Sequence, residues 1–230
     1  MSTTLRLISS MATRALLAEL AEAYAVVQPQ ISLAVESVGG VDAARRVQAG
    51  EAFDAVVLAA KAIDQLIDSG QLIAGSRADL VRSGVAVAVR AGAPAVDIGS
   101  EDAVRQAVLA ARSISFSTGP SGVHLQQLFE RWGIAEQIKD RIVQAPPGVP
   151  VGQLVAEGRV ELGFQQLSEL MNLGGIEVLG PLPEDIQIIT TFSAAVSVTC
   201  ARPDAVRALL AFMALPAMDA VKRRNGMEPG

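Results

Sequence analysis

The fold is decided by residues 5–70, which read LRLISSMATRALLAELAEAYAVVQPQISLAVESVGGVDAARRVQAGEAFDAVVLAAKAIDQLIDSG. Short apolar runs typical of buried strands alternate here with segments whose apolar residues recur at helical spacing. The predicted strands are 5–8, 31–35 and 53–58. The predicted helices are 13–27, 42–50 with Asp42 as the N-cap, and 62–69. This alternation predicts a parallel sheet with right-handed crossovers.

The rest of the chain repeats the pattern less regularly. A second β/α unit is expected over about 84–183, followed by a long β-rich segment at 186–200 and two C-terminal helices. The further predicted strands are 85–89, 114–116, 141–143, 160–165 and an edge at 174–180. The further predicted helices are 101–111, one that starts near 121 and runs to about 132, 151–157, 204–214 and 216–224.

Composition narrows the classes of function. Half of the 230 residues are hydrophobic, but only 3% are aromatic, so aliphatic side chains must form the core. That mixture suits strands buried on both faces. The net charge is −5 and the basic residues are scattered, which argues against a nucleic-acid partner. With one cysteine, Cys200, and one histidine, His124, the sequence predicts no disulfide, no metal site and no cofactor.

The sequence also carries expectations about location. No apolar run approaches the ~18 residues of a membrane span. A signal peptide begins with a basic segment that is followed by an apolar core. We see no such pattern after Met1. We therefore expect a cytoplasmic protein as encoded, or a periplasmic one if a leader peptide was removed.

Three predicted strand-to-helix junctions carry hydroxyl or small residues. In open parallel sheets, ligands bind where strands lead into helix N-termini, whose unpaired N–H groups attract anions. Glycine lets an oxygen approach the backbone, and serine adds a donor. The alternative is that these residues only cap helices. The candidate residues at the junctions are Ser9, Ser10 and Met11, then Gly39 and Gly40, then Ser121 and Gly122.

In order and spacing, these pieces resemble the molybdate-binding-like branch of the type II periplasmic substrate-binding proteins of ABC transporters. The resemblance covers nearly the whole length. It implies a two-lobed α/β fold in which each lobe is a mostly parallel sheet flanked by helices, with an interlobe cleft for a small anion. Lobe I would comprise 1–82 and 189–230, and lobe II 83–188. The matching segments are 7–10, 47–50 with 53–57, 83–89, 119–124, 155–158 with 161–166, and 180–183.

The sequence departs from the molybdate pattern where that family offers hydroxyl groups. Met11 stands at the first serine position, and Gly40 or Val41 at the second. Gln166 stands at the usual tyrosine. Gln165 and Gln166 instead offer paired donors and acceptors. These departures favour an organic acid with one or more carboxylates as the ligand.

A few further side chains are candidates for the cleft. Lys61 follows a strand, and its ammonium would pair with a carboxylate; otherwise it is a solvated helix-start lysine. Arg82, near the expected crossover, is better explained as a surface ion-pairing residue. His124 lies on the first turn of its helix and is a possible proton carrier, though packing explains it as well. Thr190, Thr191 and Ser193 follow on the return strand, where they are also ordinary strand formers.

Two functions remain open. The first is a solute-binding protein with a small anionic ligand, delivering it to an ABC permease if the chain is exported. The second is a cytoplasmic isomerase of a small di- or tricarboxylate, because aconitate isomerase resembles the same branch. Such a proton shift needs a base near the substrate carbon, with Lys61 or His124 as candidates. We expect a monomer in either case.

Overall fold

The computed structural model describes residues 3–146 and 148–230, and the chain divides into two compact units. Unit 1 consists of Met1–Ser83 and Thr191–Gly230, and unit 2 of Gly84–Thr190. The chain passes from one unit to the other within two strands, β4 (Ala78–Arg90) and β8 (Ile189–Val196). These crossings lie within two residues of the boundaries that the sequence suggested.

Unit 1 contains a mixed sheet in the order β2-β1-β3-β8-β4, and β9 pairs with β4. β1 is parallel to β2 and β3, as residues 5–70 predict, whereas β8 is antiparallel to β3. The remaining strands are β1 (Thr3–Ser10), β2 (Ile31–Val38), β3 (Ala55–Ala59) and β9 (Glu228–Pro229). The helices are η1 (Met11–Thr13), α1 (Arg14–Val27), α2 (Gly40–Gln48), α3 (Ala60–Asp68), α9 (Pro203–Met213), η4 (Pro216–Met218) and α10 (Asp219–Arg224).

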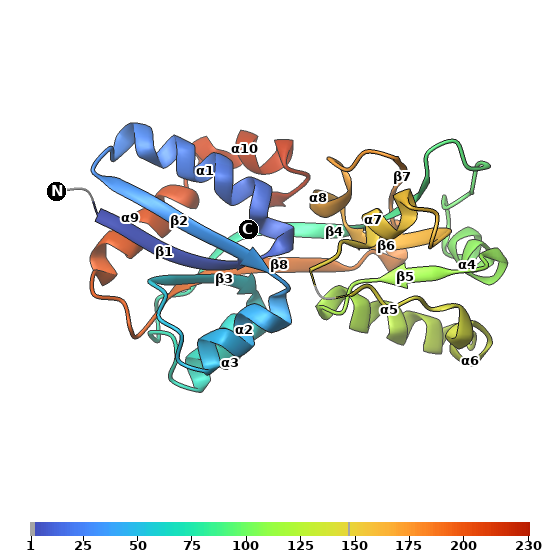
Figure 1. The fold of residues 1–230 in the computed structure, drawn as a ribbon, viewed down its shortest axis with the longest axis horizontal. Helices are drawn as coiled ribbons and strands as arrows, with labels where there is room; N and C mark the ends of the chain where they lie inside the picture. The colour runs from blue at the N-terminus through green and yellow to red at the C-terminus, as the bar shows by residue number, and fades with distance from the viewer. Residues whose placement is uncertain (1–2, 147) are drawn as a thin grey trace. The chain divides into compact units, whose positions relative to one another are not determined.

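Helices cover both faces of the unit 1 sheet (Figure 1). Side chains alternate along β1, so Leu5 and Leu7 join the cluster packed under α1 and α9. Ile8 points the other way and packs with residues of α2 and α3. The central strand β3 is buried on both faces and is a continuous apolar run, whereas β2 alternates between half-buried and exposed residues.

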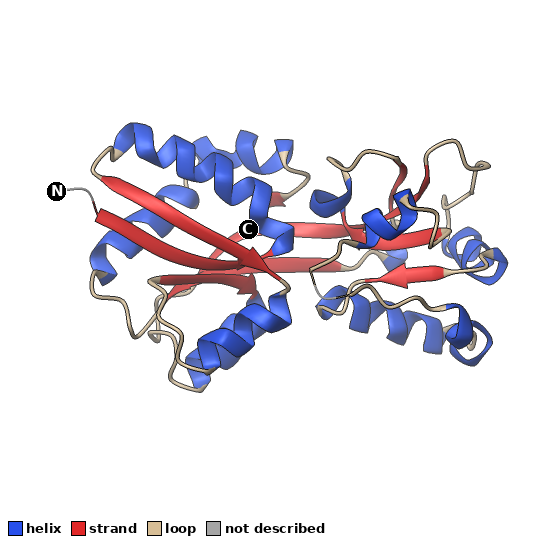
Figure 2. Cartoon of the chain, in the orientation of Figure 1, coloured by secondary structure: helices blue, strands red, loops and turns tan. Residues whose placement is uncertain are grey.

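Unit 2 contains a smaller mixed sheet in the order β7-β4-β6-β5 (Figure 2). β5 and β6 are parallel, and β4 is antiparallel to both β6 and β7. The strands, besides β4, are β5 (Ile114–Phe116), β6 (Leu162–Gln166) and β7 (Ile176–Pro181). The helices are α4 (Glu101–Ala110), α5 (Pro120–Arg131), α6 (Ala135–Ile138), η2 (Lys139–Arg141), α7 (Val151–Ala156), α8 (Leu167–Leu170) and η3 (Glu184–Ile186).

Residue size along β4 differs between the two faces of the unit 2 sheet. Val85, Val87 and Val89 pack into the larger cluster, formed with α4 and α5. Ala86 and Ala88 face the other way and contact the cluster around Leu170 of α8. The small alanines let α8 lie close to the sheet, directly after the end of β6.

Two local predictions were wrong. Residues 141–143 form the end of η2 and a single bridge between Ile142 and Ile114, not a strand. The backbone of Lys139–Arg141 forms a 3-10 turn, and Arg141 Nη1 donates to the carbonyls of Leu109 and Ala111, at 2.8 and 2.7 Å. Asp42 is not an N-cap. The helix α2 already begins at Gly40, and Asp42 accepts a hydrogen bond from Arg45.

Candidate functional site

The carboxyl ends of β1, β2 and β3 meet at one edge of the unit 1 sheet. In the parallel pairing, Ser10 lies opposite Val38 of β2, and Ser9 opposite Val57 of β3. The three strands lead directly into η1, α2 and α3. Helix starts at such an edge present unpaired backbone N–H groups and the positive ends of their dipoles. The sequence therefore places a potential anion-binding edge in unit 1.

The two serines at the end of β1 have different roles. Ser9 is buried, and its Oγ lies 2.7 Å from Ser37 Oγ in a hydrogen bond that ties β1 to β2. Ser10 is 7% exposed, and within residues 3–146 and 148–230 its Oγ has no hydrogen-bond partner. The Ser10 carbonyl accepts a bond from Thr13 Oγ1, at 3.1 Å. A buried hydroxyl without a partner is costly, so it marks a position suited to a bound acceptor.

Gly39 and Gly40 bring the start of α2 beside Ser10. Gly39 is the N-cap residue, with φ −55° and ψ 136°, and no side chain caps the helix. A Cβ added at Gly40 would lie 3.7 Å from Ser10 Cβ, which is ordinary contact. Backbone conformation and packing therefore do not demand glycine at position 40. Gly40 therefore lies directly beside Ser10, with ordinary room for a small side chain between them.

Lys61 is the second residue of α3, and it is exposed. No acidic residue lies in the first turn of α3, and within the described residues Lys61 forms no ion pair. A cation at the positive end of a helix is unfavourable unless an anion accompanies it. Arg82 is also exposed, and its Nε donates to the carbonyl of Pro229 at 3.2 Å, so it anchors the C-terminal strand.

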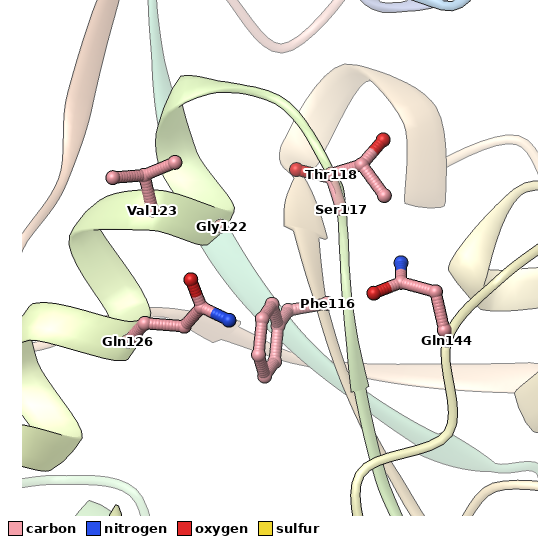
Figure 3. A pocket seen from close by; sticks show the side chains of 7 residues that line it. All are labelled: Phe116, Ser117, Thr118, Gly122, Val123, Gln126 and Gln144. Carbon is pink, nitrogen blue, oxygen red and sulfur yellow. The ribbon is translucent and has the colours of Figure 1, made fainter.

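In unit 2, the turn after β5 forms a second candidate edge. Ser117 and Ser121 share a hydrogen bond of 3.0 Å between their Oγ atoms. A cavity of about 190 Å³ lies beside this turn, and Figure 3 shows the side chains around it. Its lining residues are Phe116, Ser117, Thr118, Gly122, Val123, Gln126 and Gln144. Gly122 is required for packing, because an added Cβ would lie 1.7 Å from the Ser117 carbonyl oxygen.

His124 lies on another side of α5. It is exposed and lines a separate cavity of about 280 Å³ together with Arg131 of the same helix and Asp185 of η3. It does not line the cavity beside Ser117. The structure therefore separates His124 from the serine turn that precedes it in the sequence.

Gln165 and Gln166 are both buried at the end of β6, at 5% and 3% exposed. Gln165 Oε1 accepts from the backbone N–H of Gly152, and its Nε2 donates to Glu169 Oε2 at 2.8 Å. Gln166 Nε2 donates to Thr190 Oγ1 at 3.0 Å. Both amides thus make hydrogen bonds inside unit 2. Thr191, at the start of the unit 1 part of β8, is half-buried.

Glu169 is the residue that the sequence interpretation missed. Burial raises the pKa of its carboxyl to about 7, although the hydrogen bond from Gln165 acts in the opposite direction. An acid with a pKa near neutrality both accepts and releases a proton readily at physiological pH. The only signal in the sequence was an acidic residue in the first turn after an apolar strand, in QQLSEL at 165–170.

Residues 5–228 match the bacterial extracellular solute-binding protein family, and the chain belongs to it. Among curated proteins, an aconitate isomerase from a Pseudomonas species is 40% identical over 189 residues, which cover 80% of this chain and 70% of that protein.

Solved structures show the same fold at low identity. The periplasmic molybdate-binding protein of Azotobacter vinelandii is 20% identical, with a TM-score of 0.81 over 98% of this chain and 99% of that one. The sulfate-binding protein SubI of Mycobacterium tuberculosis H37Rv is 16% identical, with a TM-score of 0.80 over 99% and 87%. The resemblance to the periplasmic binding proteins is confirmed. None of the described helices is long and apolar enough to cross a membrane.

Proposed function

We propose that this chain binds a small organic anion with one or more carboxylates at the unit 1 edge beside Ser10. The observation that carries the proposal is the Ser10 hydroxyl, which is buried next to Gly40 at the start of α2 and has no hydrogen-bond partner among the described residues. A carboxylate oxygen placed there would accept from this hydroxyl and from backbone N–H groups, as anions do at helix N-termini.

The surroundings of Ser10 favour a carboxylate over a tetrahedral metal oxyanion. Met11 and Val41 are apolar where a cage of hydroxyl groups would need donors, and Val41 is 61% exposed. An exposed apolar side chain beside a helix start suits a ligand that has a hydrocarbon body as well as negative charge. Lys61, at the start of α3, supplies a cation for a carboxylate.

A thermal-shift screen of the purified chain tests the ligand class. The panel contains molybdate, sulfate, acetate, succinate, citrate and both isomers of aconitate. A ligand present at 100 times its Kd stabilises the native state by about 2.7 kcal/mol, which raises Tm measurably. We expect the polycarboxylates to raise Tm. Stabilisation by molybdate or sulfate alone would reject the proposal.

Two substitutions test the residues. Ser10→Ala should weaken carboxylate binding in calorimetric titration, because it removes the hydroxyl at the unit 1 edge, and Ser121→Ala tests the serine turn of unit 2 by itself. Ser115→Ala is the matched control, since Ser115 Oγ is also buried without a partner but lies within β5. Affinities that fall equally in all three variants would show that the loss is not specific to the edges.

A second candidate function is supported by the 40% identical aconitate isomerase. We propose as the alternative that the chain isomerises an unsaturated tricarboxylate by a proton shift. The two functions make different demands. A chain that only binds would hand its ligand unchanged to a transporter permease, whereas an isomerase releases a rearranged product and needs no permease.

A further inference from the structure

A hydrogen-bonded chain fixes the carboxyl of Glu169 at the end of β6. Gln165 Nε2 donates to Glu169 Oε2 at 2.8 Å, and Gln165 Oε1 accepts from the Gly152 N–H at 3.3 Å. Because both ends of the Gln165 amide are engaged, its orientation is set. The amide therefore presents its N–H to one oxygen of Glu169 and holds that carboxyl in place.

The environment of Glu169 is apolar and carries no compensating cation. Helix α8 packs through Leu170 against Ala86, Ala88 and residues of β7. In the described part of the chain Glu169 forms no ion pair. Burial raises the pKa of this carboxyl to about 7. The residue as a whole is half-buried.

Charged groups on the neighbouring elements are occupied elsewhere or exposed. Gln153 of α7 donates to the carboxylate of Glu157, the C-cap residue of that helix, at 2.9 Å. At the end of β4, the Arg90 guanidinium lies beside Gly158. Glu177 of β7 is exposed. Among the described residues none of these groups forms an ion pair with Glu169, so the protonation of Glu169 is governed by burial and by the hydrogen bond from Gln165.

Glu169 shares its sheet edge with the serine turn. β5 and β6 are parallel, with Phe116 opposite Phe164, so their carboxyl ends lie at the same edge of the unit 2 sheet. Ser117 follows β5 there, and Gln166 to Glu169 follow β6. Ser168, next to Glu169, has a buried Oγ without a hydrogen-bond partner. This edge thus carries the Glu169 carboxyl, which can take up and release a proton, and the Ser168 hydroxyl, which can still form a hydrogen bond. A catalytic site needs both kinds of group.

We propose that Glu169 is the catalytic acid–base group of the isomerase, and that Gln165 positions it. This inference rests on the second candidate function above. The Glu169 carboxylate removes a proton from the CH₂ carbon next to the double bond of a bound unsaturated polycarboxylate. The C–H electron pair becomes the new C=C bond. The electron pair of the old C=C bond takes the proton back from the Glu169 O–H at the far carbon of that bond, two carbons from the one that lost it. Atoms and charge balance, and no oxidant or cofactor takes part.

The other candidate bases fit this step less well. Lys61 and His124 are both exposed, and His124 lies in a cavity apart from the serine turn. A general base works best when its pKa lies near the operating pH and its surroundings exclude water. Glu169 has a pKa of about 7 and is half-buried, whereas the other two candidates are exposed.

The test is proton exchange in D₂O, followed by NMR with cis-aconitate and trans-aconitate as separate probes. The wild-type chain should convert one isomer into the other and introduce deuterium into the product. Glu169→Gln keeps the size and hydrogen bonding of the side chain but cannot carry the proton, so both rates should fall about 100-fold or more. Its affinity for the probes, measured by calorimetry, should stay within a few-fold of wild type.

Controls separate the possible failures. Glu177→Gln, at an exposed glutamate of the same unit, should leave the rates unchanged. Glu169→Asp should retain part of the activity with an altered pH profile, which a purely structural residue would not produce. A wild-type chain that binds both probes without exchange would end the isomerase proposal and this inference with it. An active Glu169→Gln variant would overturn the role of Glu169 alone.

Discussion

Replacing Ser10 by alanine should change stability and binding in opposite directions. The Ser10 hydroxyl is buried and unpaired in the ligand-free chain, so it loses its hydration on folding and gains nothing in return. Such a group costs about 1–3 kcal/mol, and Ser10→Ala should therefore raise the free energy of unfolding by up to that amount. Urea unfolding of the ligand-free chain, followed by fluorescence of Trp132 and far-UV circular dichroism, measures it.

The same substitution should weaken ligand binding. A hydrogen bond to a charged acceptor is worth about 1.5–3 kcal/mol, which corresponds to about a 10- to 100-fold loss of affinity for the best carboxylate. The control Ser115→Ala removes an equally unpaired hydroxyl and should stabilise the chain without affecting binding. If Ser10→Ala destabilises the ligand-free chain, the hydroxyl has a structural partner. Unchanged affinity in a stabilised variant would remove Ser10 from the site.

The remaining predictions concern other parts of the chain. Lys61→Ala should lower carboxylate affinity by up to about fivefold, because an exposed ion pair contributes about 1 kcal/mol at most. The loss should be smaller at high salt, which screens the pair. Titrations at two salt concentrations check this, with Lys139→Ala as the control. Gly122→Ala should unfold at markedly lower urea concentration, because its Cβ would overlap the Ser117 carbonyl oxygen, whereas Gly40→Ala should fold normally yet bind ligand less well. Burial raises the pKa of Glu169 from 4.5 to about 7, so the folded state holds a proton that the unfolded chain releases. The free energy of unfolding of the wild type, taken relative to that of Glu169→Gln, should therefore be highest below pH 4.5. It should decline as the pH rises to about 7, by about 3 kcal/mol at most. A series of urea melts at different pH values measures this difference, and a difference that does not change with pH would contradict the prediction.

The sequence predicted the order of the elements well where apolar runs were long. The unit 1 strands and helices could be located because β3 is a continuous apolar run, β2 alternates along its length, and the helices keep an apolar period. β4 was predicted only from Val85, although it starts at Ala78. Its first half contains Arg82, Ser83 and Gly84, which interrupt the apolar run where the chain leaves unit 1. A strand that crosses between units has no single buried face to reveal it.

The candidate site was predicted in outline but not in detail. Strand-to-helix junctions are visible in sequence, so Ser10, Gly40 and Lys61 could be proposed. Which serine is engaged depends on β1–β2 register, and only the structure shows that Ser9 bonds to Ser37 while Ser10 does not. The pKa of Glu169 depends on packing between α8, β4 and β7, residues far apart in the chain. No local pattern encodes such a long-range environment.

The insertion of unit 2 within the chain of unit 1 affects how the protein is made. During synthesis, residues 84–190 are complete before the ribosome has delivered β8, which lies between β3 and β4 in the unit 1 sheet. Until then, β3 has an uncovered edge with exposed N–H and C=O groups, a feature that promotes pairing with other chains. Translation pauses and chaperone binding should therefore matter most before Val196 emerges, while the edge of β3 that pairs with β8 is still uncovered.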